Sequence, residues 1–120
     1  MIGQSALVSN LPDALDLTRV TTVATALDDA PTRDRGWSIY VPLGSQTLDP
    51  TTKCLWVFDL WEDVEAAAAD AGWRPGLTAS EIRQVRDNLG LQVEAFDSAQ
   101  LVAAADHYFR HDAFIDLAPQ

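Results

Sequence analysis

The chain has a single cysteine, Cys54, among its 120 residues. An internal disulfide is therefore impossible, and a metal site built from several thiolates is excluded. No apolar stretch approaches the roughly 18 residues that a membrane-spanning helix needs. Residues 1–10 lack the basic and apolar regions of a secretion signal. These absences predict a soluble protein of the cytoplasm.

Basic residues are also scarce, because eight Lys and Arg face 18 Asp and Glu and give a formal charge of −10. The imbalance is concentrated in two segments. Residues 54–73 hold five acids and no base, and residues 87–120 hold six acids against Arg110 alone. Such a field repels nucleic acid and anionic membranes, and it speeds the encounter with a basic partner. We therefore expect neither nucleic acid nor membrane as a partner.

The chain does contain enough apolar material for one compact domain. Hydrophobic residues make up 48% of the sequence, and its length is close to the common domain size. At this length, folding buries roughly 65% of the surface of the unfolded chain. No internal repeat of solenoid length is present. The sequence predicts a single domain over residues 1–120, and we expect a monomer.

A capping box marks the start of a helix at residues 78–81, which read Thr-Ala-Ser-Glu. The Thr78 hydroxyl can accept from the amide of Glu81, whose carboxylate can reach back to the amide of Thr78. The apolar residues that follow share one helical face. This pattern predicts a helix over about residues 79–89, ended by Gly90 in the left-handed conformation.

A second capping box lies at residues 97–100, where Asp97 is the cap and Gln100 closes the box. An apolar stripe follows it and predicts a helix to about His111. Because the connection between the two predicted helices is short, we expect them to be neighbours.

Extended segments lie upstream of these helices. Residues 38–41 and 53–60 have the composition of strands, and a hairpin is the economical way to pair them. Because the second segment is apolar on both faces, we expect it to be a central strand. A helix over residues 62–71, ended by Gly72, should follow it, and residues 74–76 (Arg-Pro-Gly) indicate a loop.

The first thirty residues are ambiguous, because β-branched residues weaken a helical pattern. We favour a helix capped by Asp16 and a polar loop over residues 28–36. The apolar face of this helix would carry Leu17, Val20, Val23, Ala24 and Leu27. The whole pattern predicts an α+β fold. We expect a small antiparallel sheet of two or three strands, with three to four helices packed on one side.

Three groups of residues could support chemistry. His107 and His111 lie one helical turn apart and could share a metal ion, but no third histidine exists, and histidines also suit a helix C-terminus. Cys54 could act as a nucleophile with one of them, although a small buried thiol is the ordinary interpretation. Paired carboxylates could support acid–base catalysis, yet an acidic chain clusters them by chance. We expect no metal, no cofactor and no enzyme, with a small carboxylate- or histidine-dependent hydrolase as the enzymatic alternative.

Aromatic anchors surrounded by carboxylates are typical of a surface that captures a basic protein. Trp61 precedes three acids within four positions, although a large ring between a strand and a helix is often part of the core. The candidate partner-binding residues fall in the two acidic segments. They are Asp59, Trp61, Glu62, Asp63 and Glu65 in the first, and Asp106, Asp112 and Asp116 in the second.

Residues 103–116 read Ala-Ala-Ala-Asp-His-Tyr-Phe-Arg-His-Asp-Ala-Phe-Ile-Asp. They resemble the ending of a family of small bacterial proteins of unknown function, in which a helix with a Tyr-Tyr/Phe pair precedes Asp-Ala-Phe-Ile. A tryptophan-bearing strand and an apolar helix come before it in that family, as residues 55–58 and 82–85 do here. In size and acidity, such proteins resemble the immunity proteins of contact-dependent and other polymorphic toxin systems.

This resemblance implies a protein without catalytic residues that binds and neutralises a basic cognate bacterial toxin. A nuclease is the natural target, because an enzyme that holds phosphates must be basic and an acidic protein can cover its active site. The alternative is an adaptor or accessory interaction module of a bacterial complex.

Overall fold

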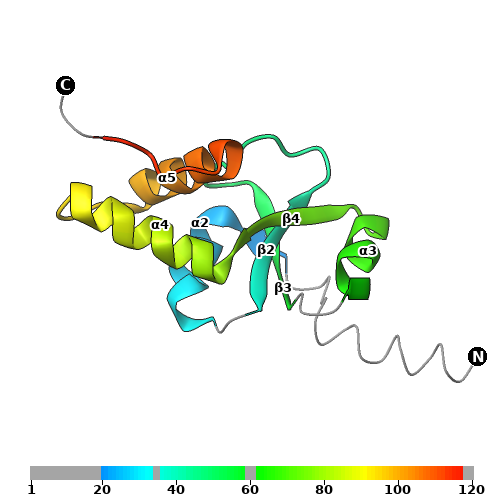
Figure 1. Ribbon diagram of the computed structural model, residues 1–120. Coiled ribbons are helices and arrows are strands. Elements are labelled where there is room, and N and C mark those ends of the chain that lie inside the picture. Colours follow the sequence, from blue (N-terminus) through cyan, green and yellow to red (C-terminus); the bar gives the residue numbers. More distant parts are fainter. Residues whose placement is uncertain (1–19, 34–35, 59–61, 118–120) are drawn as a thin grey trace, which may run out of the picture.

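The computed structural model describes residues 20–33, 36–58 and 62–117 (Figure 1). Within them, a four-stranded antiparallel sheet has the order β1-β3-β2-β4. Its strands are β1 (Thr21–Thr22), β2 (Trp37–Pro42), β3 (Lys53–Phe58) and β4 (Trp73–Thr78). The helices are α2 (Val23–Asp29), the short 3-10 helix η1 (Ala30–Thr32), α3 (Glu62–Asp70), α4 (Ala79–Gln92) and α5 (Ser98–His111). The α+β class is confirmed, with four strands where two or three were expected.

The hairpin of β2 and β3 forms the middle of the sheet. Ile39 lies opposite Trp56, and Tyr40 lies opposite Leu55. Because β3 also pairs with β1 on its other side, the prediction of a central strand is confirmed. Its residues 54–57 are buried, as the apolar composition of both faces requires.

The expected loop at residues 74–76 is wrong, because this segment is part of β4. Pro75 lies opposite Tyr40, next to a shift in the pairing register of β2 and β4. Proline is tolerated there because β4 is at the edge of the sheet, where one of its sides needs no ladder bond. A Cβ atom on Gly76 would come within 3.0 Å of the Ile39 carbonyl oxygen. Gly76 therefore allows β4 to lie close to β2 at this point, and Pro75 fits because β4 is an edge strand.

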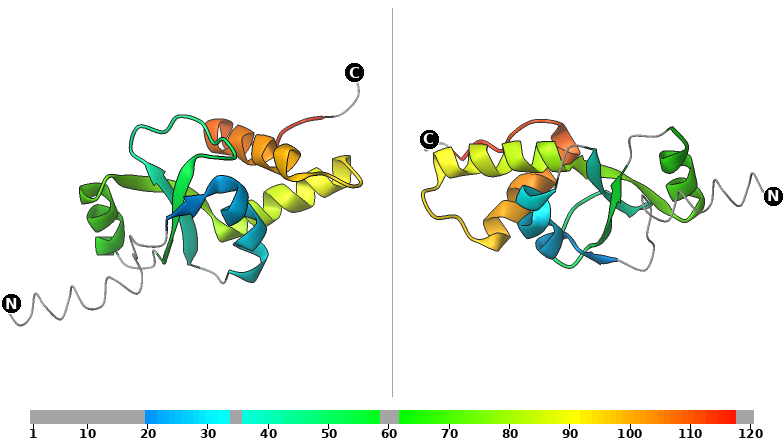
Figure 2. Two further views of the ribbon diagram at one scale, coloured as in Figure 1. Left: turned by 180° about the vertical axis from the view of Figure 1, so that it is seen from behind. Right: turned by 90° about the horizontal axis from the view of Figure 1, so that it is seen from below.

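Both faces of the sheet are covered (Figure 2). The helices α2, α4 and α5 pack on one face, and Val64 and Ala68 of α3 pack on the other. The expectation that the helices lie on one side is therefore wrong for α3. Alternation along β2 and β3 supplies both cores, with Ile39, Val41, Cys54 and Trp56 on the first face and Tyr40, Leu55 and Val57 on the second.

Both predicted capping boxes are confirmed. The Thr78 hydroxyl accepts from the Glu81 amide at 2.9 Å, and the Glu81 carboxylate accepts from the Thr78 amide at 2.9 Å. Asp97 and Gln100 make the same reciprocal pair at 2.8 and 2.9 Å. The helix α5 ends at His111, as predicted, and packs against α4.

Gly90 does not end α4, which continues to Gln92. The helix ends where Val93 adopts an extended conformation and its amide donates to the Leu89 carbonyl at 2.8 Å. An intrahelical glycine costs about 1 kcal/mol relative to alanine. Packing of the apolar face of α4 against the sheet and α5 outweighs this cost.

The N-terminal prediction is partly wrong. Thr21 and Thr22 pair with β3, and α2 begins only at Val23, where the Thr22 hydroxyl accepts from the amide of Thr25 at 3.4 Å. Residues 28–32, expected in a loop, belong to the end of α2 and to η1. The proposed cap at Asp16 lies outside the described residues. The β-branched threonines thus form the short strand and the cap rather than the first turns of a helix.

Candidate partner-binding surface

The described candidates of the first acidic segment lie on α3, which covers one face of the sheet. Asp63 and Glu65 lie exposed on α3, whose buried side packs on the sheet. Asp59, Trp61 and the side chain of Glu62 lie outside the described residues. In every view, α3 lies at the far end of the molecule from the connection between α4 and α5 (Figures 1 and 2).

The second set lies on α5 and on the segment that follows it. Asp106 is 17% exposed, and both of its carboxylate oxygens are engaged. One accepts from the Leu48 amide at 2.7 Å, and the other from Arg110 Nε at 2.9 Å. Asp106 therefore holds the loop after β2 on α5, a structural role that its charge did not reveal.

Asp112 and Asp116 are exposed beyond the end of α5. Asp112 caps the helix in the left-handed conformation, with φ of 54°, and its amide donates to the Tyr108 carbonyl at 2.7 Å. The helices α3 and α5 pack on opposite faces of the sheet. Among the described candidates, Asp63 and Glu65 on α3 therefore do not share a surface with those on α5.

The arginines explain why so much negative charge stays exposed. Arg83 donates to the Arg33 carbonyl at 2.7 Å, and Arg86 donates to the Leu27 carbonyl at 3.3 Å. These carbonyls lie at the ends of α2 and η1, where the helix dipole favours a cation. Arg74 donates to the Ser45 carbonyl. These guanidinium groups act as links between backbone segments.

Two guanidinium groups also lie over aromatic rings. Arg33 lies over Trp37 at 4.9 Å and over Trp56 at 5.0 Å, and Arg74 lies over Phe109 at 4.9 Å, each measured from the guanidinium carbon to the ring centroid. Trp56 is buried, and its indole nitrogen has no hydrogen-bond partner. Arg110 pairs with the largely buried Asp106. The arginines of the described residues are thus engaged by carbonyls, rings or Asp106.

Neither the two histidines nor the cysteine belongs to a metal-binding cluster within the described residues. The rings of His107 and His111 lie 4.6 Å apart on α5, but the described residues hold no cluster of three potential metal ligands. Cys54 is fully buried, and burial raises the pKa of its thiol to about 12. It is therefore protonated at neutral pH and poorly suited to act as a nucleophile.

A contact between the C-terminal segment and α4 could not be predicted from the sequence. The Gln92 side chain donates to the Ile115 carbonyl at 2.8 Å and accepts from the Leu117 amide at 2.7 Å. It also donates to the Asn88 side chain at 2.8 Å. A single amide side chain thus holds the segment after α5 against the last turn of α4. No local pattern announces such a bond, because its partners are 23 and 25 residues away.

The fold is an acidic α+β domain, and within the described ranges no helix has the length and apolar character to cross a membrane. Residues 19–117 match the family model of a domain of unknown function, DUF7716, and the chain belongs to this family. Searches of curated proteins and of solved structures found no match.

Proposed function

We propose that this protein is a cytoplasmic, non-catalytic immunity protein that binds a basic bacterial toxin, a nuclease in the first instance, and covers its active site. The observation that carries the proposal is that four arginines bind backbone carbonyls and Asp106 and not the exposed carboxylates. Arg83, Arg86 and Arg74 bind backbone carbonyls, and Arg110 binds Asp106. With a formal charge of −10, the chain therefore presents exposed carboxylates that these arginines leave unneutralised.

The charge supports a basic protein as the target. A nuclease holds phosphates with Lys and Arg, so a surface rich in carboxylates can compete for the same groove. Carboxylates chiefly steer the encounter and exclude wrong partners, while a few apolar anchors supply most of the affinity. The proposal therefore requires exposed carboxylates and exposed anchors on the same face of a monomer.

The decisive experiment is co-expression with the product of the adjacent upstream gene, scored for growth rescue and for a complex that survives purification. Rescue together with a stable complex is the expected result. A complex with a product that is not toxic would support the adaptor alternative, and neither toxicity nor complex would refute the proposal.

A kinetic measurement tests the electrostatic part. The association rate should fall steeply as ionic strength rises, because salt screens the attraction between exposed charges. The variant Asp63→Asn/Glu65→Gln/Glu94→Gln/Asp112→Asn should associate more slowly and with a flatter salt dependence. An association rate indifferent to salt in both proteins would contradict the charge-steering mechanism.

A further inference from the structure

Three large apolar side chains are exposed on or beside the helix pair α4–α5. Leu91 is 87% exposed, Leu117 is 44% exposed and Phe114 is 42% exposed. Leu91 lies on the opposite side of α4 from the buried stripe of residues 82, 85 and 89, as the helical repeat dictates. Its side chain therefore contributes little to the core of this domain.

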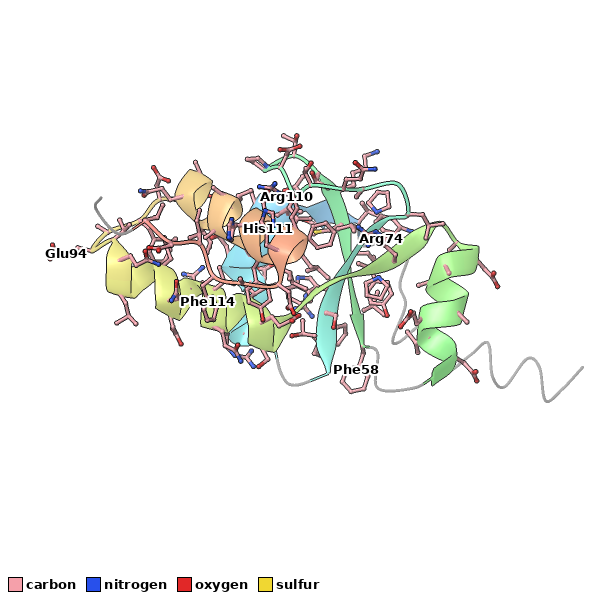
Figure 3. The ribbon with its side chains drawn as sticks, turned by 45° about the horizontal axis from the view of Figure 1, so that its top comes forward. Phe58, Arg74, Glu94, Arg110, His111 and Phe114 are labelled. Carbon is pink, nitrogen blue, oxygen red and sulfur yellow. The ribbon has the colours of Figure 1, made fainter. Side chains whose placement is uncertain are left out.

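Gln92 brings two of these side chains to the same end of the molecule. Leu91 precedes Gln92 in α4, and the amide of Leu117 donates to the Gln92 side chain at 2.7 Å. The segment after α5 therefore runs back beside α4 toward its C-terminal end (Figure 2). Phe114 belongs to this segment (Figure 3). Its ring packs against the Tyr108 ring at a centroid distance of 5.4 Å.

Exposed carboxylates neighbour Leu91 and Phe114 along the chain. Asp87 and Glu94 are exposed one turn before and three residues after Leu91, and Glu94 marks the far end of the helix pair in Figure 3. Asp112 is exposed two residues before Phe114. We use the name C-terminal patch for the following six residues: Leu91, Phe114 and Leu117 with Asp87, Glu94 and Asp112.

The negative charge around these apolar side chains decides which kind of molecule can bind there. A second copy would place carboxylates against carboxylates across a two-fold axis, which like-charge repulsion opposes. Nucleic acid and anionic membranes are repelled by the same field. A basic protein with an apolar centre meets both requirements, because it buries the three side chains and pairs with the carboxylates.

We propose that the C-terminal patch is the docking surface for a basic partner protein. The inference rests on the proposed function and names the face that performs it. The exposed positions on α3 compare poorly, since its described residues expose only acids and alanines and offer no large apolar anchor. Apolar anchors within a charged rim are the usual arrangement of a protein interface.

The experiment uses the full chain and two synthetic helical peptides of equal length and positive charge as probes. One peptide combines Lys with Leu, and the other combines Lys with Gln. Fluorescence anisotropy should show tighter binding of the Lys/Leu peptide. The double variant Leu91→Ser/Leu117→Ser should weaken that binding on the order of tenfold, a loss of about 1.4 kcal/mol. The matched control is Leu43→Ser, an exposed leucine in the loop after β2, which should leave the affinity within about twofold.

A second pair of variants separates the location of charge from its amount. Asp87→Asn/Glu94→Gln removes two charges from the C-terminal patch, and Asp63→Asn/Glu65→Gln removes two charges from α3. Only the first pair should weaken peptide binding by more than about threefold. Equal losses from the two pairs, equal affinity for the two peptides, or no binding of either peptide would overturn the proposal. Circular dichroism of each variant checks that the fold is retained.

Failure of this inference can be told apart from failure of the proposed function. If Leu91→Ser/Leu117→Ser still rescues growth like the unmodified protein, toxin neutralisation stands but uses another face, and the patch proposal is overturned. If the peptide results are as expected but the co-expressed protein gives no rescue, the patch is supported as a basic-protein site and the immunity function is refuted.

Discussion

The carboxylate of Asp106, in the middle of α5, accepts a hydrogen bond from the backbone amide of Leu48 at 2.7 Å. The two residues are 58 positions apart, and Leu48 is buried. Arg110 binds the other oxygen of the same carboxylate and keeps it oriented. The long loop between β2 and β3 is therefore fixed on the last helix by the Asp106 side chain.

Replacing Asp106 by alanine should destabilise the protein by about 1–3 kcal/mol, because a largely buried amide would lose its acceptor. Urea unfolding followed by circular dichroism measures this loss. Asp63→Ala, which removes an exposed carboxylate from α3, should change the free energy of unfolding by less than about 0.5 kcal/mol. Equal effects of the two variants would show that charge alone, and not the bond to Leu48, governs stability.

Gly72 and Gly44 provide a matched pair for backbone conformation. Gly72 has φ of +95°, and a Cβ there would meet no atom within 4 Å, so alanine would suffer only backbone strain. Gly72→Ala should cost about 1–2 kcal/mol. Gly44 also has open space around it and needs no positive φ. Gly44→Ala should be neutral or stabilise by up to about 1 kcal/mol. Thermal unfolding of both variants tests the difference, and a harmless Gly72→Ala would contradict the turn geometry.

The capping box of α4 can be tested within one helical turn. Thr78→Ala removes the acceptor for the Glu81 amide and should cost about 1 kcal/mol. Ser80→Ala, two residues later at an exposed position, should be neutral or slightly stabilising, because alanine is the better helix former. Chemical denaturation of the two variants and the parent compares them directly. A loss of stability from Ser80→Ala as large as that from Thr78→Ala would argue against the cap.

Cys54 should be slow to react in the folded protein. Burial raises the pKa of its thiol from 9.0 to about 12, so at pH 7.5 the folded state holds about a thousandfold less thiolate than the unfolded state. Reaction with a chromogenic disulfide reagent, with and without denaturant, measures the ratio of rates. Equal rates in the two conditions would contradict burial of the thiol.

The same shift in pKa makes stability depend on alkaline pH. Between about pH 9 and pH 12 the unfolded state releases the proton of Cys54 and the folded state keeps it. The free energy of unfolding should therefore fall as pH rises through this range. Cys54→Ala should show a smaller fall over the same range, which unfolding curves at several alkaline pH values would reveal.

Local hydrogen bonds made the two long helices predictable from sequence. A capping box such as Thr78 with Glu81 involves residues three positions apart, so the sequence pattern itself predicts the bond. β4 could not be recognised in this way. Its Pro75 and Gly76 have the propensity of a turn, and only pairing with β2 at the edge of the sheet makes them a strand. The choice of face by α3 likewise depends on the path of the chain and not on helical periodicity.

The candidate site was less predictable, because charge in the sequence does not give position in space. Asp63 and Asp112 were both identified, yet they lie on elements packed against opposite faces of the sheet. Asp106 is acidic like them but has a structural role. Leu91 was missed, although its place off the apolar stripe of α4 is visible in the sequence and could have marked it as an exposed anchor.

The arginines that bind carbonyls and rings belong to the scaffold of this domain and not to the proposed docking surface. Arg83 ties α4 to the end of η1, Arg86 ties it to α2, and no carboxylate takes part in those bonds. Exposed acids that take part in no cap or loop contact, such as Asp63 and Glu65, can therefore be exchanged for other residues without loosening the frame that carries them. A lineage of such domains could change partners by altering surface side chains alone, while the arginine contacts keep the architecture constant.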